Sequence, residues 1–327
     1  MSVLTGTATD YLDLLAQLRT FLKTDATLVA LGQNWTELAT NATPYTVVDN
    51  GVTNTVDYET YLKAPGLSTT EAIYVNIQAY HNAGNDIWNW RMKGAIGFIA
   101  LGGGSTFETQ PGSSPDAFLL LWDQPITYWF IANGQRVIVV AKISTVYESC
   151  YLGKLLPYGT PSQYPYPLVI AGTAGVGSAT MPLNLPGNAN LRYSDVSNQH
   201  AAFFDPAILY WCDLNSAWRG MTHWSQFGGG HANSGGADAV WPWFAGDSYP
   251  ADFIEPNLDG SYPLFAARLE IATLATPEIL GELDGVFYTT GFGSSSESTF
   301  TVGSDTYYVF QSCFRTAKEF FAALKWA

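Results

Sequence analysis

The sequence predicts a mainly β protein, built of packed sheets in a β-sandwich-like arrangement, with an N-terminal helical segment and a short C-terminal helix. From Tyr45 onward, short β-branched and aromatic runs are separated by Gly, Pro, Asn, Ser and Asp, which is the pattern of strands and turns. The pair Asn133-Gly134 joins two such runs. Helical spacing of apolar residues is found only near the two ends of the chain.

The first element is a helix from Tyr11 to about Thr24. Asp10 is a suitable N-cap, because its carboxylate can accept hydrogen bonds from the first free backbone N–H groups. The apolar residues that follow at helical spacing are Leu14, Leu15, Leu18, Phe21 and Leu22. They share one face, so we expect this face to pack against the rest of the protein.

The middle of the chain is predicted to be strands. The clearest hairpin joins residues 128–132 to residues 135–140 through Asn133-Gly134, a pair favoured where both turn residues need positive φ, so we expect a type I′ turn. Further strands are expected at residues 72–79, 87–100, 117–122, 168–172, 264–271 and 285–290. A late hairpin is expected from residues 300–302 and 306–311, around Gly303-Ser304-Asp305.

A closing helix is expected from about residue 315 to residue 326, since Phe320, Phe321, Leu324 and the stem of Lys318 can share a stripe. Four parts are distinguished along the chain. They are an N-terminal helical segment (1–60), a first β-rich part (61–212), a Gly/Trp-rich arm or insertion (213–263), and the closing strands with the C-terminal helix (264–327). The alternative is a single compact domain.

The composition favours a protein that contacts neighbours. Charged residues make up only 13% of the 327 residues, whereas aromatic residues make up 15% and include eleven Trp. Aromatic residues are enriched and charged residues depleted in interface cores. The net charge of −14 disfavours nucleic acid and anionic membranes as partners. No basic-then-apolar leader is seen and no apolar run is long enough to span a bilayer, so we expect a chain synthesised in the cytoplasm.

Cysteine and histidine give weak signals for a metal site. Cys150, Cys212 and Cys313 are far apart and lack zinc-site spacing, so we interpret them as buried thiols. His223 and His231 flank a glycine-rich loop with Asp238 beyond it, and a metal-dependent hydrolase there is a minor alternative. The other two histidines, His81 and His200, are expected to be surface groups or satisfied core groups.

Residues 147–167 form a strip rich in Tyr and Pro. Such a strip is stiff and carries ring hydroxyls, which suits docking on a neighbour at low entropic cost. A rigid loop over the protein's own sheet is an equally weighted alternative. The candidate interface residues in the strip and in the Trp-rich arm are Tyr151, Tyr158, Tyr164, Tyr166, Trp241 and Trp243.

The segment that begins with the valine-rich run 136–140 contains a distinctive order of motifs. Next come Ser144-Thr145-Val146-Tyr147-Glu148-Ser149, then Tyr151-Leu152-Gly153, Pro157-Tyr158, and Gln163-Tyr164-Pro165-Tyr166-Pro167-Leu168. This order, within residues 88–172, resembles a segment of structural proteins of tailed-bacteriophage particles, typically tail or baseplate components. The resemblance implies a virion location and other virion subunits as partners in a symmetric assembly, and it supplies no site residue.

Enzymatic alternatives have weaker support. Glu282 and Asp284 lie two apart, as paired carboxylates of a glycosidase could, although the adjacent glycines favour a turn. The sequence has no GxSxG elbow, P-loop or dinucleotide fingerprint. We therefore predict a non-enzymatic virion subunit without a cofactor. The alternative is a carbohydrate- or receptor-binding protein that uses the Trp-rich arm and stacks sugars on tryptophans in or next to it, with Trp211, Trp218, Trp224, Trp241 and Trp243 as candidates.

Overall fold

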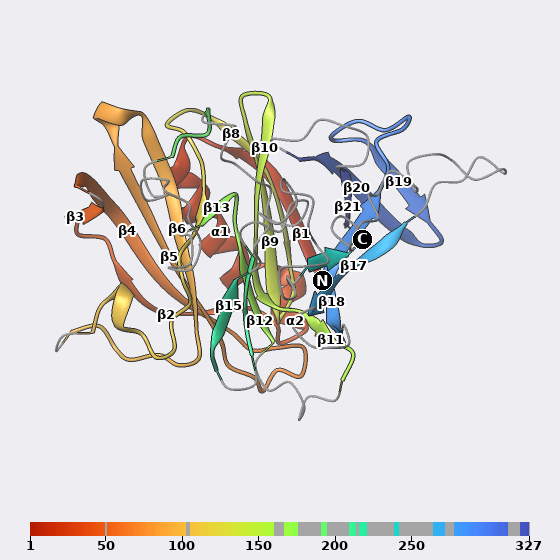
Figure 1. The fold of residues 1–327 in the computed structure, drawn as a ribbon, viewed down its shortest axis with the longest axis horizontal. Coiled ribbons are helices and arrows are strands. Elements are labelled where there is room, and N and C mark those ends of the chain that lie inside the picture. The colour runs from red at the N-terminus through yellow and green to blue at the C-terminus, as the bar shows by residue number, and fades with distance from the viewer. Residues whose placement is uncertain are drawn as a thin grey trace, which may run out of the picture.

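Three antiparallel sheets, packed as successive layers, make up most of the described part of the chain (Figure 1). The computed structural model describes residues 1–49, 51–102, 105–159, 167–175, 191–194, 209–213, 216–220, 239–241, 264–271, 278–312 and 321–326. The predicted mainly β class is confirmed, and packed sheets are seen. None of the helices in these ranges is long and apolar enough to cross a membrane.

The central sheet is covered on both faces. Its strand order is β1 (Ser2–Ala8), β8 (Ile126–Ala132), β9 (Arg136–Ile143), β10 (Val146–Lys154), β12 (Leu168–Ala171), β14 (Leu209–Cys212) and β15 (Trp218–Gly220). In β9, Val137 and Val139 belong to one hydrophobic core, while Ile138 and Val140 belong to the other. A strand buried on both faces needs a continuous apolar run, which explains the valine-rich sequence of β9.

A second sheet, here called the N-terminal sheet, packs on one face of the central sheet (Figure 1). Its order is β13 (Ala174–Gly175), β7 (Ala117–Leu119), β6 (Ile87–Ala95), β5 (Ile73–Asn82), β4 (Val52–Ala64) and β2 (Thr36–Asn41), and β3 (Tyr45–Asp49) also pairs with β4. The short 3₁₀ turn η1 (Ala83–Asn85) joins β5 to β6, and η2 (Phe107–Thr109) lies between β6 and β7.

Helix α1 (Tyr11–Thr24) lies between these two sheets and contacts β1 and β8 on one side and β2, β5 and β6 on the other. The predicted cap is confirmed, because Asp10 Oδ1 accepts hydrogen bonds from the N–H groups of Leu12 and Asp13, both at 2.8 Å. The predicted apolar face is confirmed too, since all five of its residues are buried. The short helix α2 (Ala26–Ala30) follows directly.

The C-terminal sheet packs on the other face of the central sheet. Its order is β16 (Ala239–Trp241), β17 (Phe265–Ile271), β18 (Glu278–Thr289), β21 (Phe321–Lys325), β20 (Asp305–Gln311) and β19 (Thr299–Val302), with β11 (Leu156–Pro157) also on β18. The predicted late hairpin is confirmed as β19 and β20, joined by Gly303-Ser304.

The predicted C-terminal helix is wrong where the structure describes it, because residues 321–325 form strand β21. This strand pairs with β18 on one side and β20 on the other. Ala322 and Leu324 face the core shared with the central sheet. Pairing on both edges and burial outweigh the helix propensity of Ala and Leu, which is a weak local preference.

The hairpin of β8 and β9 is confirmed, but its turn is not type I′. Residues 133–135 separate β8 from β9, the N–H of Asn133 donates to the carbonyl oxygen of Arg136, and neither Asn133 nor Gly134 has positive φ. Asn133 Oδ1 instead accepts the N–H groups of Gln135 and Arg136. Gly134 is needed for close approach, since a Cβ there would lie 2.2 Å from the carbonyl oxygen of Gly66.

Strand pairing crosses the four parts drawn from the sequence. The N-terminal part, residues 1–60, contains strands as well as helices, namely β1, β2, β3 and the first residues of β4. Strand β1 pairs with β8 of the second part, and β11 of the second part pairs with β18 of the last. The four ranges therefore share their sheets with one another.

Candidate functional site

The tyrosines predicted to dock on a neighbour differ in exposure. Tyr151 is fully buried in the core between the central and C-terminal sheets, and its hydroxyl donates to the carbonyl oxygen of Lys154 at 2.8 Å. Its ring therefore packs within this chain. Tyr158 is 52% exposed, donates its hydroxyl to Glu282, and lies 6.0 Å from the guanidinium of Arg268. Burial and the Glu282 carboxylate raise the pKa of Tyr158 to about 12.

Of the other candidate interface residues, only Trp241 lies within the described part of the chain. Tyr164, Tyr166 and Trp243 lie outside the described residues. Trp241 ends strand β16, where it pairs with Arg268 of β17. Among the described tyrosines of the strip, Tyr158 is therefore the most exposed, whereas Tyr147 is partly buried and Tyr151 fully buried.

The two carboxylates considered for glycoside hydrolysis are each engaged by an arginine. Glu282 lies 3.9 Å from Nε of Arg268. Asp284 lies 3.1 Å from Nε of Arg136, which is completely buried between the central and C-terminal sheets, and also accepts from Asn133 Nδ2 at 2.6 Å. These contacts tie strand β18 to its neighbours, and they give both acids a structural role.

The predictions for histidine and cysteine are met where the structure describes them. His81 is a satisfied group, because its Nδ1 lies 2.6 Å from Asp57 Oδ2 and its ring stacks on Trp88. Cys150 and Cys212 are buried free thiols, as expected. Cys313, His200, His223, His231 and Asp238 lie outside the described residues. Within the described ranges, no cluster of three or more His, Cys, Asp or Glu could hold a metal ion.

A buried acid in the central sheet was not singled out by the sequence. Glu148 of β10 is 0% exposed and pairs with Ala141 of β9, on the face toward α1 and the N-terminal sheet. Among the described residues, the Thr173 side chain is the group that favours its ionised form, and this contact falls short of full hydrogen-bond geometry. Burial raises the pKa of Glu148 to about 8, and the Thr173 side chain opposes the shift. The protein thus carries a neutral carboxylic acid in its core at neutral pH.

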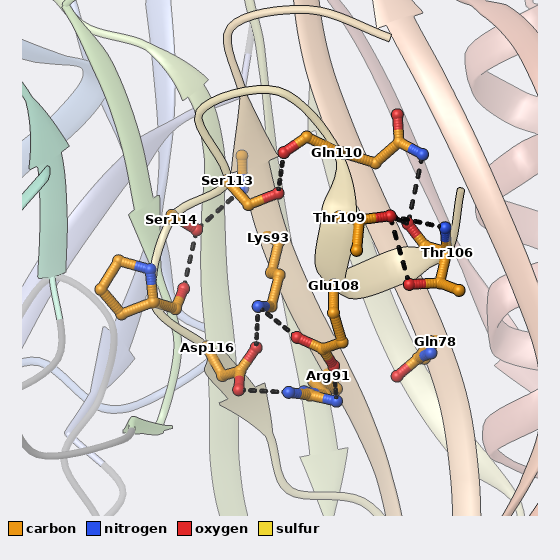
Figure 2. Close-up of polar contacts among 12 residues, drawn as sticks. Gln78, Arg91, Lys93, Thr106, Glu108, Thr109, Gln110, Ser113, Ser114 and Asp116 are labelled. Carbon is orange, nitrogen blue, oxygen red and sulfur yellow. Dashed lines mark hydrogen bonds and ion pairs between the residues drawn. The ribbon is translucent and has the colours of Figure 1, made fainter. Parts of the chain in front are cut away.

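A network of four charged side chains lies on the outer face of the N-terminal sheet (Figure 2). Arg91 and Lys93 project from the same face of β6. Arg91 contacts Asp116 Oδ2 and Glu108 Oε1 at 2.5 Å each, and Lys93 Nζ contacts Glu108 Oε2 at 2.7 Å and Asp116 Oδ1 at 3.2 Å. Two cations and two anions neutralise one another. The network fixes η2, which carries Glu108, onto the sheet.

The segment around η2 is further held by one glutamine. Gln110 is 3% exposed, and its Nε2 donates to the carbonyl oxygen of Thr106 at 3.2 Å (Figure 2). The same Nε2 also donates to Ser105 Oγ at 2.9 Å. Its Oε1 accepts from the N–H of Ile99 at 2.9 Å. The segment therefore forms a fixed wall over the sheet.

Between this wall and the strands lies a cavity of about 760 Å³, here called the η2 pocket. It is lined by Thr40 and Asn41 of β2, Thr43, Tyr45 and Val47 of β3, Glu59 of β4, Gln78 of β5, and Leu101, Gly102, Ser105, Thr106, Phe107 and Glu108. Its volume falls within the range typical of small-molecule sites.

Sequence reasoning missed the residues of this pocket, although a signal was present. Polar residues alternate with apolar ones in Asn76-Ile77-Gln78-Ala79 and again in Asn89-Trp90-Arg91-Met92-Lys93. Such alternation indicates a strand with one polar face. The position of η2 over that face depends on tertiary structure. A scan of protein-family models and a search of curated proteins found no match to this chain.

Proposed function

We propose that this chain is a non-enzymatic structural subunit of a tailed-bacteriophage particle, most simply in the tail or baseplate, where it acts through docking on other virion subunits. The resemblance of residues 88–172 to tail and baseplate proteins motivates the location. That range runs through β6, β7, β8, β9, β10 and β12, so it contributes the middle of the central sheet as well as an outer loop.

The observation that best supports docking is that three strands at sheet edges expose large apolar side chains. Strands β1, β3 and β19 each lie at an edge, and each exposes a large apolar side chain: Leu4 is 37%, Val48 70% and Val302 51% exposed. Edge strands of isolated proteins are commonly protected by Lys, Pro or a covering segment. None of these three strands contains Lys or Pro. Neighbouring subunits would cover such edges in an assembly.

The surface tyrosine adds a second point of contact. Tyr158 is held in one orientation by Glu282 and lies close to Arg268, so its half-exposed ring loses little conformational freedom on docking. Tyrosine and arginine are enriched among the residues that dominate binding energy at interfaces. The engagement of Glu282 and Asp284 with arginine also supports a structural rather than a catalytic use of β18.

The test is peptide mass spectrometry on density-purified particles of the phage that encodes the chain, with copy number measured against the major capsid subunit. The proposal predicts recovery at a fixed ratio that survives a second round of purification. Absence from the particles, or a ratio that varies between preparations, would contradict a role as a structural subunit.

A further inference from the structure

We propose that the η2 pocket binds a neutral saccharide, with a sugar ring hydrogen-bonded to Glu59 and Glu108 and packed against Tyr45. This activity goes beyond docking between subunits. It rests on the pocket alone, so its failure would leave the virion proposal standing.

The pocket contains a buried carboxylate that is held by neutral donors. Glu59 is 4% exposed and accepts hydrogen bonds from the Tyr45 hydroxyl, from the Tyr61 hydroxyl at 3.2 Å, and from Gln78 Nε2 at 2.6 Å. Within the described residues, no Lys, Arg or His forms an ion pair with it. A carboxylate has about four lone-pair sites, so about one remains for a ligand donor.

The second carboxylate is fixed by cations on the side away from solvent. Glu108 is half exposed, and its two oxygens meet Arg91 and Lys93. Burial alone would raise the pKa of Glu108, but Arg91 and Lys93 outweigh burial and hold it below its ordinary value. Glu108 is therefore an ionised acceptor with lone pairs still available and with its charge already balanced.

The remaining lining suits a ring that carries hydroxyl groups. Thr40, Thr43, Ser105 and Thr106 supply hydroxyls that can donate or accept, and Asn41 supplies an amide. Tyr45, Val47 and Leu101 add apolar surface, and the C–H face of a sugar packs well on an aromatic ring. Polar groups with adjoining aromatic surface meet the needs of a saccharide.

Two other ligand classes fit less well. The lining residues include no Lys, Arg or His, which disfavours a phosphate or a nucleotide. A cationic ligand would meet Arg91 and Lys93 directly behind Glu108. At Glu108 the charge is already balanced, so this carboxylate offers a ligand acceptor capacity, and a neutral polyol with several donors satisfies that chemistry.

The test is saturation-transfer NMR on the full chain with millimolar hexoses, N-acetylhexosamines, deoxyhexoses and short oligosaccharides built from them, followed by calorimetry on each sugar that responds. Glu59→Gln keeps the side-chain volume but replaces an acceptor oxygen by an amide N–H₂. We expect it to weaken binding at least tenfold. The matched control is Glu71→Gln, a carboxyl that pairs with Lys154 outside the pocket lining and should leave affinity unchanged.

Tyr45→Ala is the second variant, because Tyr45 is only partly buried and its ring is the proposed packing surface. The melting temperature of each variant is measured. If Glu59→Gln does not fold, the affinity of Tyr45→Ala for the sugar tests the proposal in its place. The inference is overturned if no sugar gives transfer, if binding is unaffected by Glu59→Gln in a folded protein, or if the pocket binds tetramethylammonium or inorganic phosphate in preference to every sugar.

Discussion

Replacing Glu148 by Gln is expected to remove a pH-dependent cost of folding. Burial raises the pKa of this carboxyl from 4.5 to about 8 in the folded protein. Between these two values the unfolded chain has released the proton while the folded protein still holds it. Because the unfolded state binds fewer protons, the free energy of unfolding falls as pH rises through this window.

The magnitude follows from the size of the shift. Each unit of pKa difference corresponds to about 1.4 kcal/mol, so raising the pH from about 5.5 to about 7.5 should lower the free energy of unfolding by about 2.5 kcal/mol through this one group. Glutamine is neutral throughout, so Glu148→Gln contributes no such slope. The pH range stays above the isoelectric point of about 4.5, where a protein of low charge would precipitate.

The assay is urea unfolding followed by tryptophan fluorescence at several pH values, for the wild type, Glu148→Gln and Asp123→Asn. Asp123 is exposed, and its replacement controls for the loss of one acidic group. All other groups titrate alike in wild type and variant, so the difference in unfolding free energy isolates Glu148. We expect Glu148→Gln to gain about 2.5 kcal/mol relative to wild type as the pH rises from about 5.5 to about 7.5. A difference that stays constant with pH would refute a neutral buried carboxylic acid.

Three further predictions follow from the contacts between layers and from the exposed edges. Asp284→Ala leaves the buried Arg136 without its carboxylate partner and should lower the free energy of unfolding, measured in urea, by about 3 kcal/mol. The double variant Arg136→Met with Asp284→Leu should recover most of this lost stability. Equal losses in the single and the double variant would contradict the cost assigned to an unpaired buried arginine. Tyr158→Ala should leave the melting temperature of the isolated chain unchanged but weaken its incorporation into particles by about 2 kcal/mol. Tyr158→Phe retains the ring and serves as the control. If the isolated Tyr158→Ala variant unfolds, the ring belongs to this chain's own core instead. Val302→Lys should likewise reduce copy number in particles without changing the melting temperature, and unchanged copy number would show that β19 is not covered.

Local patterns predicted the elements whose signal lies in neighbouring residues. Helix α1 follows from the Asp10 cap and its apolar face, and the hairpin of β8 and β9 from two apolar runs around Asn133-Gly134. The identity of β21 was missed, because Ala322 and Leu324 are good helix formers, and only pairing with β18 and β20 makes them a strand. Strand order likewise depends on contacts between residues far apart in sequence.

The η2 pocket was harder still to predict from the sequence, because its lining residues come together only through contacts between distant parts of the chain. Glu59 and Gln78 come from adjacent strands, and Glu108 reaches them through a turn that Arg91 and Lys93 hold in place. Alternation in β5 and β6 indicated a polar face, yet no spacing in the sequence indicates that η2 folds over it. Glu282 and Asp284 lie within strand β18 rather than in the turn that the adjacent glycines favoured, and nothing local indicated their arginine partners, which lie on other strands.

The most direct test of the proposed virion role is electron cryomicroscopy of the intact particle at a resolution that shows side chains. A tail or baseplate subunit should give density that fits the three stacked sheets, with β1, β3 or β19 covered by a neighbouring subunit and Tyr158 at a contact. Particles that lack this density, or that carry the chain with all three edges facing solvent, would contradict it.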